Sequence, residues 1–356
     1  MRLKRLILLA SAGVSSGQTL AEVLTAQSAT LSMLNSWLSS QELIFTILSG
    51  AQGVTLLAPS NDALTELYNS PLANQLAQDP NLLTAFLAYH VLDGIFFNSH
   101  FVNTQPHLSL PTLLDIETFS NVSGGQRIIS TSQNGAVTFF SGHGAQAAVQ
   151  GADYNYAGGT LHIIESCLTI PGSVTNTLIA AGLTAALGAL RRCKMEDRLN
   201  TDTDVTIFVP NNDAFKAIGS LVDGMTLEQL TTVLNYHVVP GKVLYSQQIS
   251  GGGQALTAEG AMLNFRTLDG ELFVNSARIV QPNLLIANGV VHVCDGVLNP
   301  ANATAAPNPS ASTQEPAFAG ASSTDGEVPF TSAIPTVTSP ATSTVSGVKA
   351  EAREAV

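Results

Sequence analysis

The stretch Gly53-Val-Thr-Leu-Leu-Ala-Pro-Ser-Asn-Asp-Ala-Leu64 returns later in the chain as Asp204-Val-Thr-Ile-Phe-Val-Pro-Asn-Asn-Asp-Ala-Phe215. Two shorter blocks recur in the same order: Tyr89-His-Val-Leu92 as Tyr236-His-Val-Val239, and Gly159-Thr-Leu-His-Ile-Ile164 as Gly289-Val-Val-His-Val-Cys294. Three blocks in one order indicate that the chain carries one module twice. A repeat this long is typical of a domain that closes its own core. Residues present in both copies are therefore expected to serve the fold rather than a reaction.

Each copy is predicted to begin with amphipathic helices, because apolar residues recur there at helical spacing. The residues expected on the buried faces are Leu31, Leu34, Leu38, Leu43, Phe45, Ile47 and Leu48 in the first copy and Leu178, Ile179, Leu183, Ala186, Leu187 and Leu190 in the second.

The repeated stretch itself predicts a strand followed by a helix. Residues 54–58 and 205–209 read as strands, and each stops at a proline that cannot donate to a sheet ladder. Ser60-Asn61 and Asn211-Asn212 are suited to capping the helices that come next.

Another helix is expected to lead to each Tyr-His pair, and alternating strand segments fill the last third of each copy. Helices before strands, without regular βαβ alternation, predict an α+β fold with a largely antiparallel sheet. The first copy has extra residues at about 101–126, which we expect to form an enlarged surface loop.

The N-terminus has the pattern of a secretory signal peptide, residues 1–17. Basic residues precede a short apolar run, Leu6 to Ala10, and cleavage after Gly17 would free a chain that begins with Gln18. The run is too short to span a bilayer, and no later segment predicts a transmembrane helix. Without the leader the chain has 11 basic against 26 acidic residues, and no basic stripe, which makes a nucleic-acid function very unfavourable.

Three cysteines suit a secreted chain with one disulfide, and Cys193–Cys294 is the favoured pair because both lie in the second copy. Cys167 closes the first copy and has no zinc-type neighbours. Asn121-Val-Ser and Asn302-Ala-Thr are N-glycosylation sequons and are expected at the surface.

The composition changes after Pro300. Residues 301–356 are rich in Ala, Ser, Thr and Pro with very few aromatics, which predicts a disordered, O-glycosylated tail. The sequence at Val348–Val356 lacks the terminal apolar stretch of a GPI signal, so such an anchor is not supported. The predicted organisation is thus a leader (1–17), two domains (18–171 and 172–300) and a tail (301–356).

Four histidines are matched across the copies, His90 with His237 and His162 with His292. Their neighbours are apolar strand residues and no HExxH or His-x-His spacing accompanies them, which favours buried imidazoles bonded to backbone groups over metal ligands. The sequence also shows no nucleophile elbow and no phosphate-binding loop. We therefore predict no enzyme activity, no catalytic residue, no cofactor and no metal.

The three repeated blocks resemble the fasciclin domain family: its Thr-Φ-Φ-Ala-Pro-x-Asn-x-Ala-Φ signature (Φ is apolar), its Tyr-His pair and its final motif, present as Asn288-Gly-Val-Val-His-Val293. The resemblance covers roughly residues 18–300. It implies two tandem wedges, each a twisted β-sandwich packed with several helices. The whole plan resembles secreted fungal fasciclin-like glycoproteins, which are associated with cell adhesion, the cell wall and the extracellular matrix.

The resemblance also implies adhesion candidates. In animal members of the family the Tyr-His segment has been implicated in integrin-type adhesion, and here it corresponds to Tyr89-His90 and Tyr236-His237. An adhesive Asp-Ile motif falls at Asp153 and at Asn283, where neither copy keeps Asp-Ile, and no Arg-Gly-Asp occurs.

We therefore expect a non-enzymatic adhesion or matrix glycoprotein with weak, multivalent contacts to cell-surface, wall or matrix proteins or glycans, and to other copies of itself. The alternative is a secreted module that binds a small lipid or glycan between its strands and helices.

Overall fold

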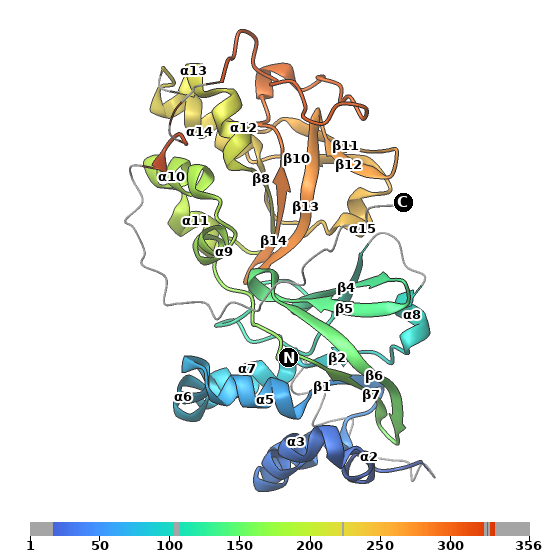
Figure 1. Ribbon diagram of the computed structural model, residues 1–356. Helices are drawn as coiled ribbons and strands as arrows, with labels where there is room; N and C mark the ends of the chain where they lie inside the picture. The colour runs from blue at the N-terminus through green and yellow to red at the C-terminus, as the bar shows by residue number, and fades with distance from the viewer. Residues whose placement is uncertain (1–16, 103–106, 223, 324–325, 327, 332–356) are drawn as a thin grey trace, which may run out of the picture.

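The computed structural model describes residues 17–102, 107–222, 224–323, 326 and 328–331. Figure 1 shows two halves, each with a sheet and its own group of helices, joined near residue 172. Nearly all of the expected leader (residues 1–16) and the end of the chain (residues 332–356) lie outside the described residues.

The first half, domain 1, begins with three helices that precede its first strand. After this strand come further helices, the last of which ends at the Tyr-His pair, and then the remaining strands. Its elements are α2 (Leu20–Ala26), α3 (Ser28–Ser40), α4 (Glu42–Gly50), β1 (Val54–Pro59), α5 (Asn61–Tyr68), α6 (Pro71–Gln78), α7 (Pro80–Tyr89), β2 (Val91–Asp93), α8 (Asn98–Val102), β3 (Leu108–Pro111), β4 (Arg127–Gln133), β5 (Ala136–Phe140), η1 (Gly142–Gly144), β6 (Gln146–Tyr156) and β7 (Gly159–Ile164).

The second half, domain 2, repeats that order. Its elements are α9 (Val174–Ala180), α10 (Thr184–Arg192), α11 (Glu196–Thr201), β8 (Val205–Pro210), α12 (Asn212–Ala217), α13 (Gly219–Val222), α14 (Leu227–Tyr236), β9 (Val238–Val239), α15 (Ser246–Ile249), β10 (Gly253–Leu256), β11 (Met262–Leu268), β12 (Glu271–Val274), β13 (Ala277–Ile286) and β14 (Gly289–Cys294), followed by η2 (Pro300–Asn302).

The two sheets have the same strand order. Each has seven strands. Written from equivalent edges, the order is β2-β1-β7-β6-β5-β4-β3 in domain 1 and β9-β8-β14-β13-β12-β11-β10 in domain 2. The one parallel pairing in each sheet joins the repeated strands, β1 with β7 and β8 with β14, in a register that places Leu57 opposite His162 and Phe208 opposite His292. The other pairings are antiparallel. The predicted α+β class with two tandem domains is confirmed.

The predicted caps begin the helices after β1 and β8. The Ser60 hydroxyl accepts from the backbone N–H of Ala63, and the Asn211 side chain accepts from that of Ala214. Each cap satisfies an N–H that the first turn of the helix leaves unpaired.

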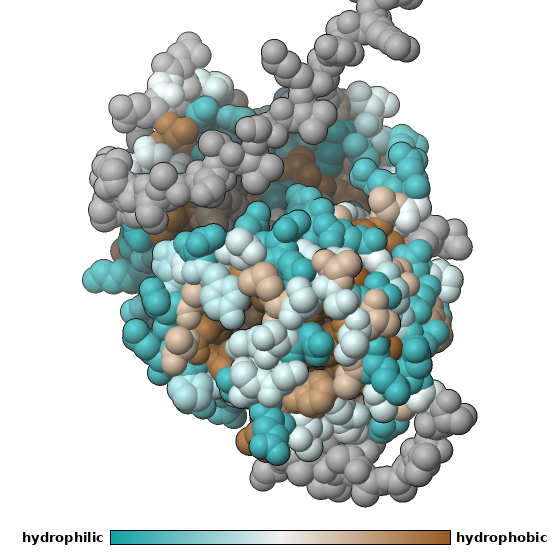
Figure 2. All heavy atoms as spheres, turned by 60° about the horizontal axis from the view of Figure 1, so that its bottom comes forward, coloured by the Kyte–Doolittle hydropathy of each residue, from teal (hydrophilic) through white to brown (hydrophobic). Residues whose placement is uncertain are grey.

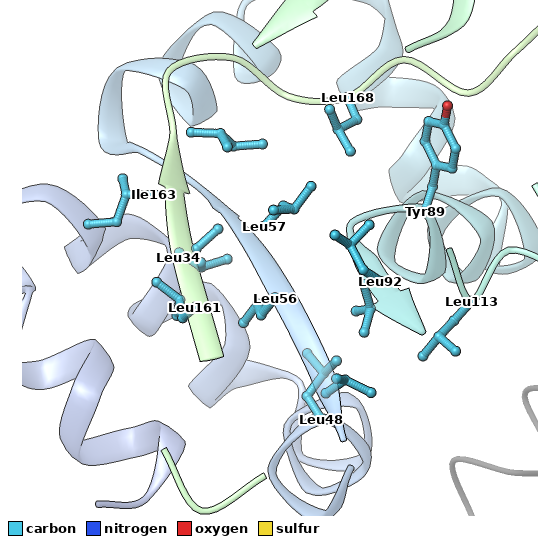
Figure 3. Packing of buried hydrophobic residues seen from close by; sticks show 14 of the residues in the cluster. Leu34, Leu48, Leu56, Leu57, Tyr89, Leu92, Leu113, Leu161, Ile163 and Leu168 are labelled. Atoms are coloured by element: carbon cyan, nitrogen blue, oxygen red, sulfur yellow. The ribbon is translucent and has the colours of Figure 1, made fainter. Parts of the chain in front are cut away.

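The core of domain 1 forms where β1 meets its neighbours. Figure 3 shows Leu56 and Leu57 of β1 beside Leu161 of β7 and Leu92 of β2. All six residues of β1 are buried, and so are those of β8, which explains why the repeated stretch is almost continuously apolar.

Three expectations about burial and loops are wrong. Leu43 and Ile179 were expected in the helical cores, but they are 74% and 40% exposed. Residues 101–126 do more than form a surface loop, because they supply β3 and the buried residue Leu114, and residues 121–126 contact domain 2.

The expectation of disorder beyond residue 300 is also wrong for the part that the structure describes. Figure 1 shows this segment running over domain 2. Arg278 donates to the carbonyl oxygens of Pro309 and Ala311, at 3.3 and 2.6 Å, and Gln314 is buried. Composition failed here because a polar, Ala-rich segment can pack against an existing surface without forming a core of its own. Within the described residues, no helix is long and apolar enough to cross a membrane.

Candidate functional site

The Tyr-His pairs lie inside the two domains, at the end of α7 and of α14. The Tyr89 and Tyr236 side chains are 0% exposed, and their hydroxyls donate to the carbonyl oxygens of Arg127 (3.0 Å) and Met262 (2.9 Å). Each pair therefore ties a helix end to a strand on the other side of the core.

The histidine of each pair bridges two backbone groups. His90 Nε2 accepts from the N–H of Leu168 at 2.9 Å, so the proton is on Nδ1, which donates to the Phe86 carbonyl at 2.8 Å. His237 makes the same two bonds, at 2.9 and 2.7 Å, with Leu298 and Val233. Both imidazoles are buried and use their two nitrogens for the fold.

The other histidine pair is used in the same way with the nitrogens exchanged. His292 Nδ1 accepts from the N–H of Asn283 at 3.4 Å, and Nε2 donates to the Leu244 carbonyl at 2.8 Å. His162 bonds Asp153 N–H (3.3 Å) and the Phe96 carbonyl (2.7 Å) equivalently.

Asp153 and Asn283, the positions that match the Asp-Ile motif, lie in bulges of β6 and β13. Both have a φ of 62°, in the left-handed region. Asp153 accepts from the N–H of Asn98 at 2.8 Å, and Asn283 from that of Ser246 at 2.8 Å, so each side chain receives the first N–H of the helix α8 or α15. Asn and Asp tolerate this backbone conformation better than β-branched residues.

These contacts keep the histidines neutral. Burial lowers the pKa of His90, His237 and His292 to about 4, against smaller opposing effects of their carbonyl partners, and also lowers the pKa of His162. A proton on the second nitrogen would break a bond from a backbone N–H.

Of the six adhesion candidates, five are therefore inaccessible: Tyr89, His90, Tyr236, His237 and Asn283 are all at most 5% exposed. Asp153 is exposed, but its carboxylate is engaged with α8. The interpretation of the histidines as buried imidazoles bonded to the backbone agrees with these contacts, whereas a contact surface made of Tyr-His pairs does not.

Two further pairs of residues act identically in both copies, in roles that the sequence alone did not predict. Thr55 and Thr206 each donate to one carbonyl oxygen and accept from one N–H of the segment after the next strand, all at 2.8 Å. Asn61 and Asn212, beside the cap residues, accept from the backbone N–H of Met33 in α3 (2.9 Å) and of Ala185 in α10 (3.0 Å). The repeat itself was the signal, since all four residues stand in the repeated stretch.

The domains meet along a seam formed by residues 121–127 and the neighbouring strands of domain 2. Gln126 is buried and its amide donates to the Ile286 carbonyl at 3.0 Å, while Ser123 N–H donates to the Asp204 carboxylate at 2.7 Å. Ile129 of domain 1 packs in one buried cluster with Tyr245, Leu285 and Val290 of domain 2. The two domains are thus held by specific polar and apolar contacts.

The first sequon lies in this seam. Asn121 is half-buried, and its side-chain amide donates to the Thr201 carbonyl of domain 2 at 3.1 Å. Asn302 is exposed, as expected, and donates to the Ala317 carbonyl at 3.1 Å.

The expected Cys193–Cys294 disulfide is wrong: Cys167, Cys193 and Cys294 are all free thiols. Cys193 ends α10 and packs against the helical cluster of domain 2, whereas Cys294 ends β14 in a separate buried cluster behind the sheet. Membership of one domain did not bring the two residues together. Burial also raises the pKa of the Cys193 and Cys294 thiols, and that of Cys167 to about 12.

Thiol labelling checks this arrangement. In denaturant, without reductant, a maleimide is expected to add to all three cysteines, and in the native protein Cys294 should react slowest because it is fully buried. Mass spectrometry of tryptic peptides counts the adducts. A single adduct in denaturant would instead show that two of the three cysteines are joined in a disulfide.

Domain 1 has a cleft of about 800 Å³ among α3 to α7. Its lining is mainly apolar and includes Trp37, Leu43, Leu64, Tyr68 and Phe86. No three His, Cys, Asp or Glu residues in the described ranges lie close enough to hold a metal ion.

The two domains are similar, and in each of them the matched polar residues hydrogen-bond the backbone of that domain. This arrangement defines a scaffold of two tandem domains. A family model, the fasciclin domain, matches residues 29–171 and 181–300. A fasciclin-like arabinogalactan protein of Arthroderma benhamiae is 37% identical over 87% of this chain and 73% of its own length, and another of Cercospora beticola is 34% identical over 69% and 67%. Human periostin is 24% identical over 70% of this chain and 27% of its own length. The chain belongs to the fasciclin family.

Proposed function

We propose that the protein is a secreted, non-enzymatic glycoprotein that adheres at the cell surface, the cell wall or the extracellular matrix. The main observation behind the proposal is that the matched histidines are not available for chemistry. Both ring nitrogens of each are hydrogen-bonded to backbone groups. Function is then left to the outer surfaces. The names of the relatives, fasciclin-like arabinogalactan proteins, and the similarity to periostin support the same role.

The arrangement of the domains favours weak, multivalent contact. The seam fixes two similar bodies in one orientation, so two contacts can form at once and their affinities combine. A chain with 26 acidic residues suits neutral or basic wall and matrix components better than anionic lipid or nucleic acid.

Secretion is part of the proposal. The basic and apolar pattern of residues 1–17 would direct export, and the exposed Asn302 sequon would then receive a glycan. A loss of mass on enzymatic removal of N-glycans from the secreted chain would test this step directly.

Binding is tested with the full secreted chain. We expect it to be retained on isolated wall or matrix material, or on immobilised copies of itself, in physiological salt, and heat-denatured chain serves as the control. Protease or glycosidase treatment of the material then distinguishes a protein partner from a glycan partner. Absence of retention on all three supports would refute the adhesive role.

A further inference from the structure

The cleft of domain 1 has a covered counterpart in domain 2. Near the end of the described chain, Phe318, Ala321, Val328 and Phe330 pack against the helical cluster of domain 2 and are partly buried there. Figure 1 shows this last described segment beside α10. The chain thus covers this helical surface with residues from its own C-terminal part.

Phe330 anchors that segment. Its ring lies edge-on to Phe215, with centroids 5.8 Å apart, and the guanidinium of Arg192 stands 5.6 Å from its centroid. The backbone of Phe330 contacts Gly188 so closely that a side chain there would collide with it. Farther along, Ser322 N–H donates to the Ser220 hydroxyl at 2.9 Å, and Ser220 N–H to the Ser322 carbonyl at 3.2 Å.

The matched asparagines identify the same positions in domain 1. Asn61 and Asn212 bind Met33 and Ala185 in the same way, so Leu64 corresponds to Phe215 and Ser40 to Arg192. Leu64 and Ser40 both line the cleft of domain 1. The surface that the chain covers in domain 2 therefore corresponds in position to part of the cleft that no described residue fills in domain 1.

The open groove is well shaped for an apolar occupant. Leu43 and Tyr68 at its edges are 74% and 58% exposed, and a narrow apolar gap beneath the cleft continues from Trp37 past Phe86 to His90. Figure 2 views the molecule from the domain 1 end and shows hydrophobic residues among hydrophilic ones on this face. Trp37 stands at the position of Ala189 in domain 2, so the cleft of domain 1 has an aromatic ring in its lining. In domain 2 Arg192 contacts the Phe330 ring, and its position in domain 1 is taken by Ser40.

We propose that the cleft of domain 1 binds an extended peptide segment of a partner protein, with a phenylalanine anchor among small residues, the chemistry of residues 318–330. The anchor would insert beside Trp37 and Leu64, as Phe330 packs against Phe215 in domain 2. This goes beyond adhesion at the wall or matrix and does not depend on it.

Trp37 is the only tryptophan of the chain, so its fluorescence reports on this cleft alone. The full chain is titrated with a synthetic peptide of residues 316–331 with blocked ends. We expect a saturable blue shift of the emission as water leaves the indole. A peptide with Phe330→Ala should bind at least tenfold more weakly, because aromatic anchors dominate such contacts.

Matched variants locate the site. Leu43→Glu places a charge at the edge of the cleft and should weaken binding at least tenfold without harming the fold, because Leu43 is mostly exposed. Leu256→Glu, at a 55% exposed leucine of β10, is the control and should leave the titration unchanged. Oleate is titrated in parallel as a small apolar ligand.

The outcomes decide between occupants. Saturable peptide binding that falls with Leu43→Glu and with the Phe330→Ala peptide, but not with Leu256→Glu, supports the proposal. A fluorescence response to oleate without one to the peptide, no response to either, or equal binding by the Leu43→Glu chain would overturn it.

Discussion

Lowering the pH from 7 to about 4.5 is expected to remove most of the stability of domain 2. His237 and His292 have a pKa of about 4 in the folded protein, against an ordinary value of 6.5. The unfolded chain therefore binds more protons than the folded one between these values. The stabilisation is present above pH 6.5 and is lost as the pH falls toward 4.

The expected loss is large compared with the stability of a domain. Each of the two buried histidines contributes about 2.5 kcal/mol to the change by pH 4.5, so the pair removes about 5 kcal/mol, the order of a whole domain's free energy of unfolding. Asp295 acts in the opposite direction, because burial raises its pKa and its protonation favours the folded state. Domain 1 should weaken in the same pH range through His90 and His162.

Urea unfolding followed by circular dichroism at a series of pH values measures this loss. The control is His100→Gln, at an exposed histidine of domain 1, which should leave the loss of stability in domain 2 unchanged. A free energy of unfolding that stays constant between pH 7 and about 4.5 would show that the buried imidazoles are not neutral residues held by the fold.

Replacement of His237 by alanine is expected to cost about 3–5 kcal/mol of stability. The substitution leaves the buried N–H of Leu298 and the carbonyl of Val233 without their partners and opens a cavity at the end of α14. The equivalent change at His90 should weaken domain 1 to a similar degree, because the same two bonds are lost there.

Thermal and urea unfolding at neutral pH measure the effect, away from the acid transition. His100→Ala is the control, and we expect it to cost about 1 kcal/mol or less because His100 is exposed and accepts a single N–H bond, from Phe97. A loss below about 1 kcal/mol for His237→Ala would contradict a framework role for the Tyr-His pair.

The sequence predicted the parts of the fold that depend on local pattern and on repetition. The strand that ends at Pro59, the cap at Ser60 and the buried His90 follow from apolar runs, side-chain chemistry and the existence of a second copy. Each of these features is decided within a few residues, so the pattern along the chain was enough to predict them.

The parts that depend on distant contacts could not be predicted in this way. From the sequence alone, residues 121–126 read as a loop, and their role depends on the contact between Gln126 and Ile286. Phe330 likewise reads as an isolated aromatic residue in a polar tail, although it packs against Phe215. The cysteine pairing was wrong for a related reason, because Cys193 and Cys294 share a domain but lie in different clusters. Leu43 fits helical periodicity, yet it stands at the edge of a cleft and not in the core.

The position of Asn121 ties a carbohydrate modification to the order in which the chain is made. Thr201, whose carbonyl receives the Asn121 amide, follows it by 80 residues, so an enzyme that modifies the growing chain meets the asparagine before its neighbour has folded. A sugar added then would replace one of the two amide hydrogens at the joint between the domains. Chains with and without that sugar would therefore differ in how strongly the two domains are held together.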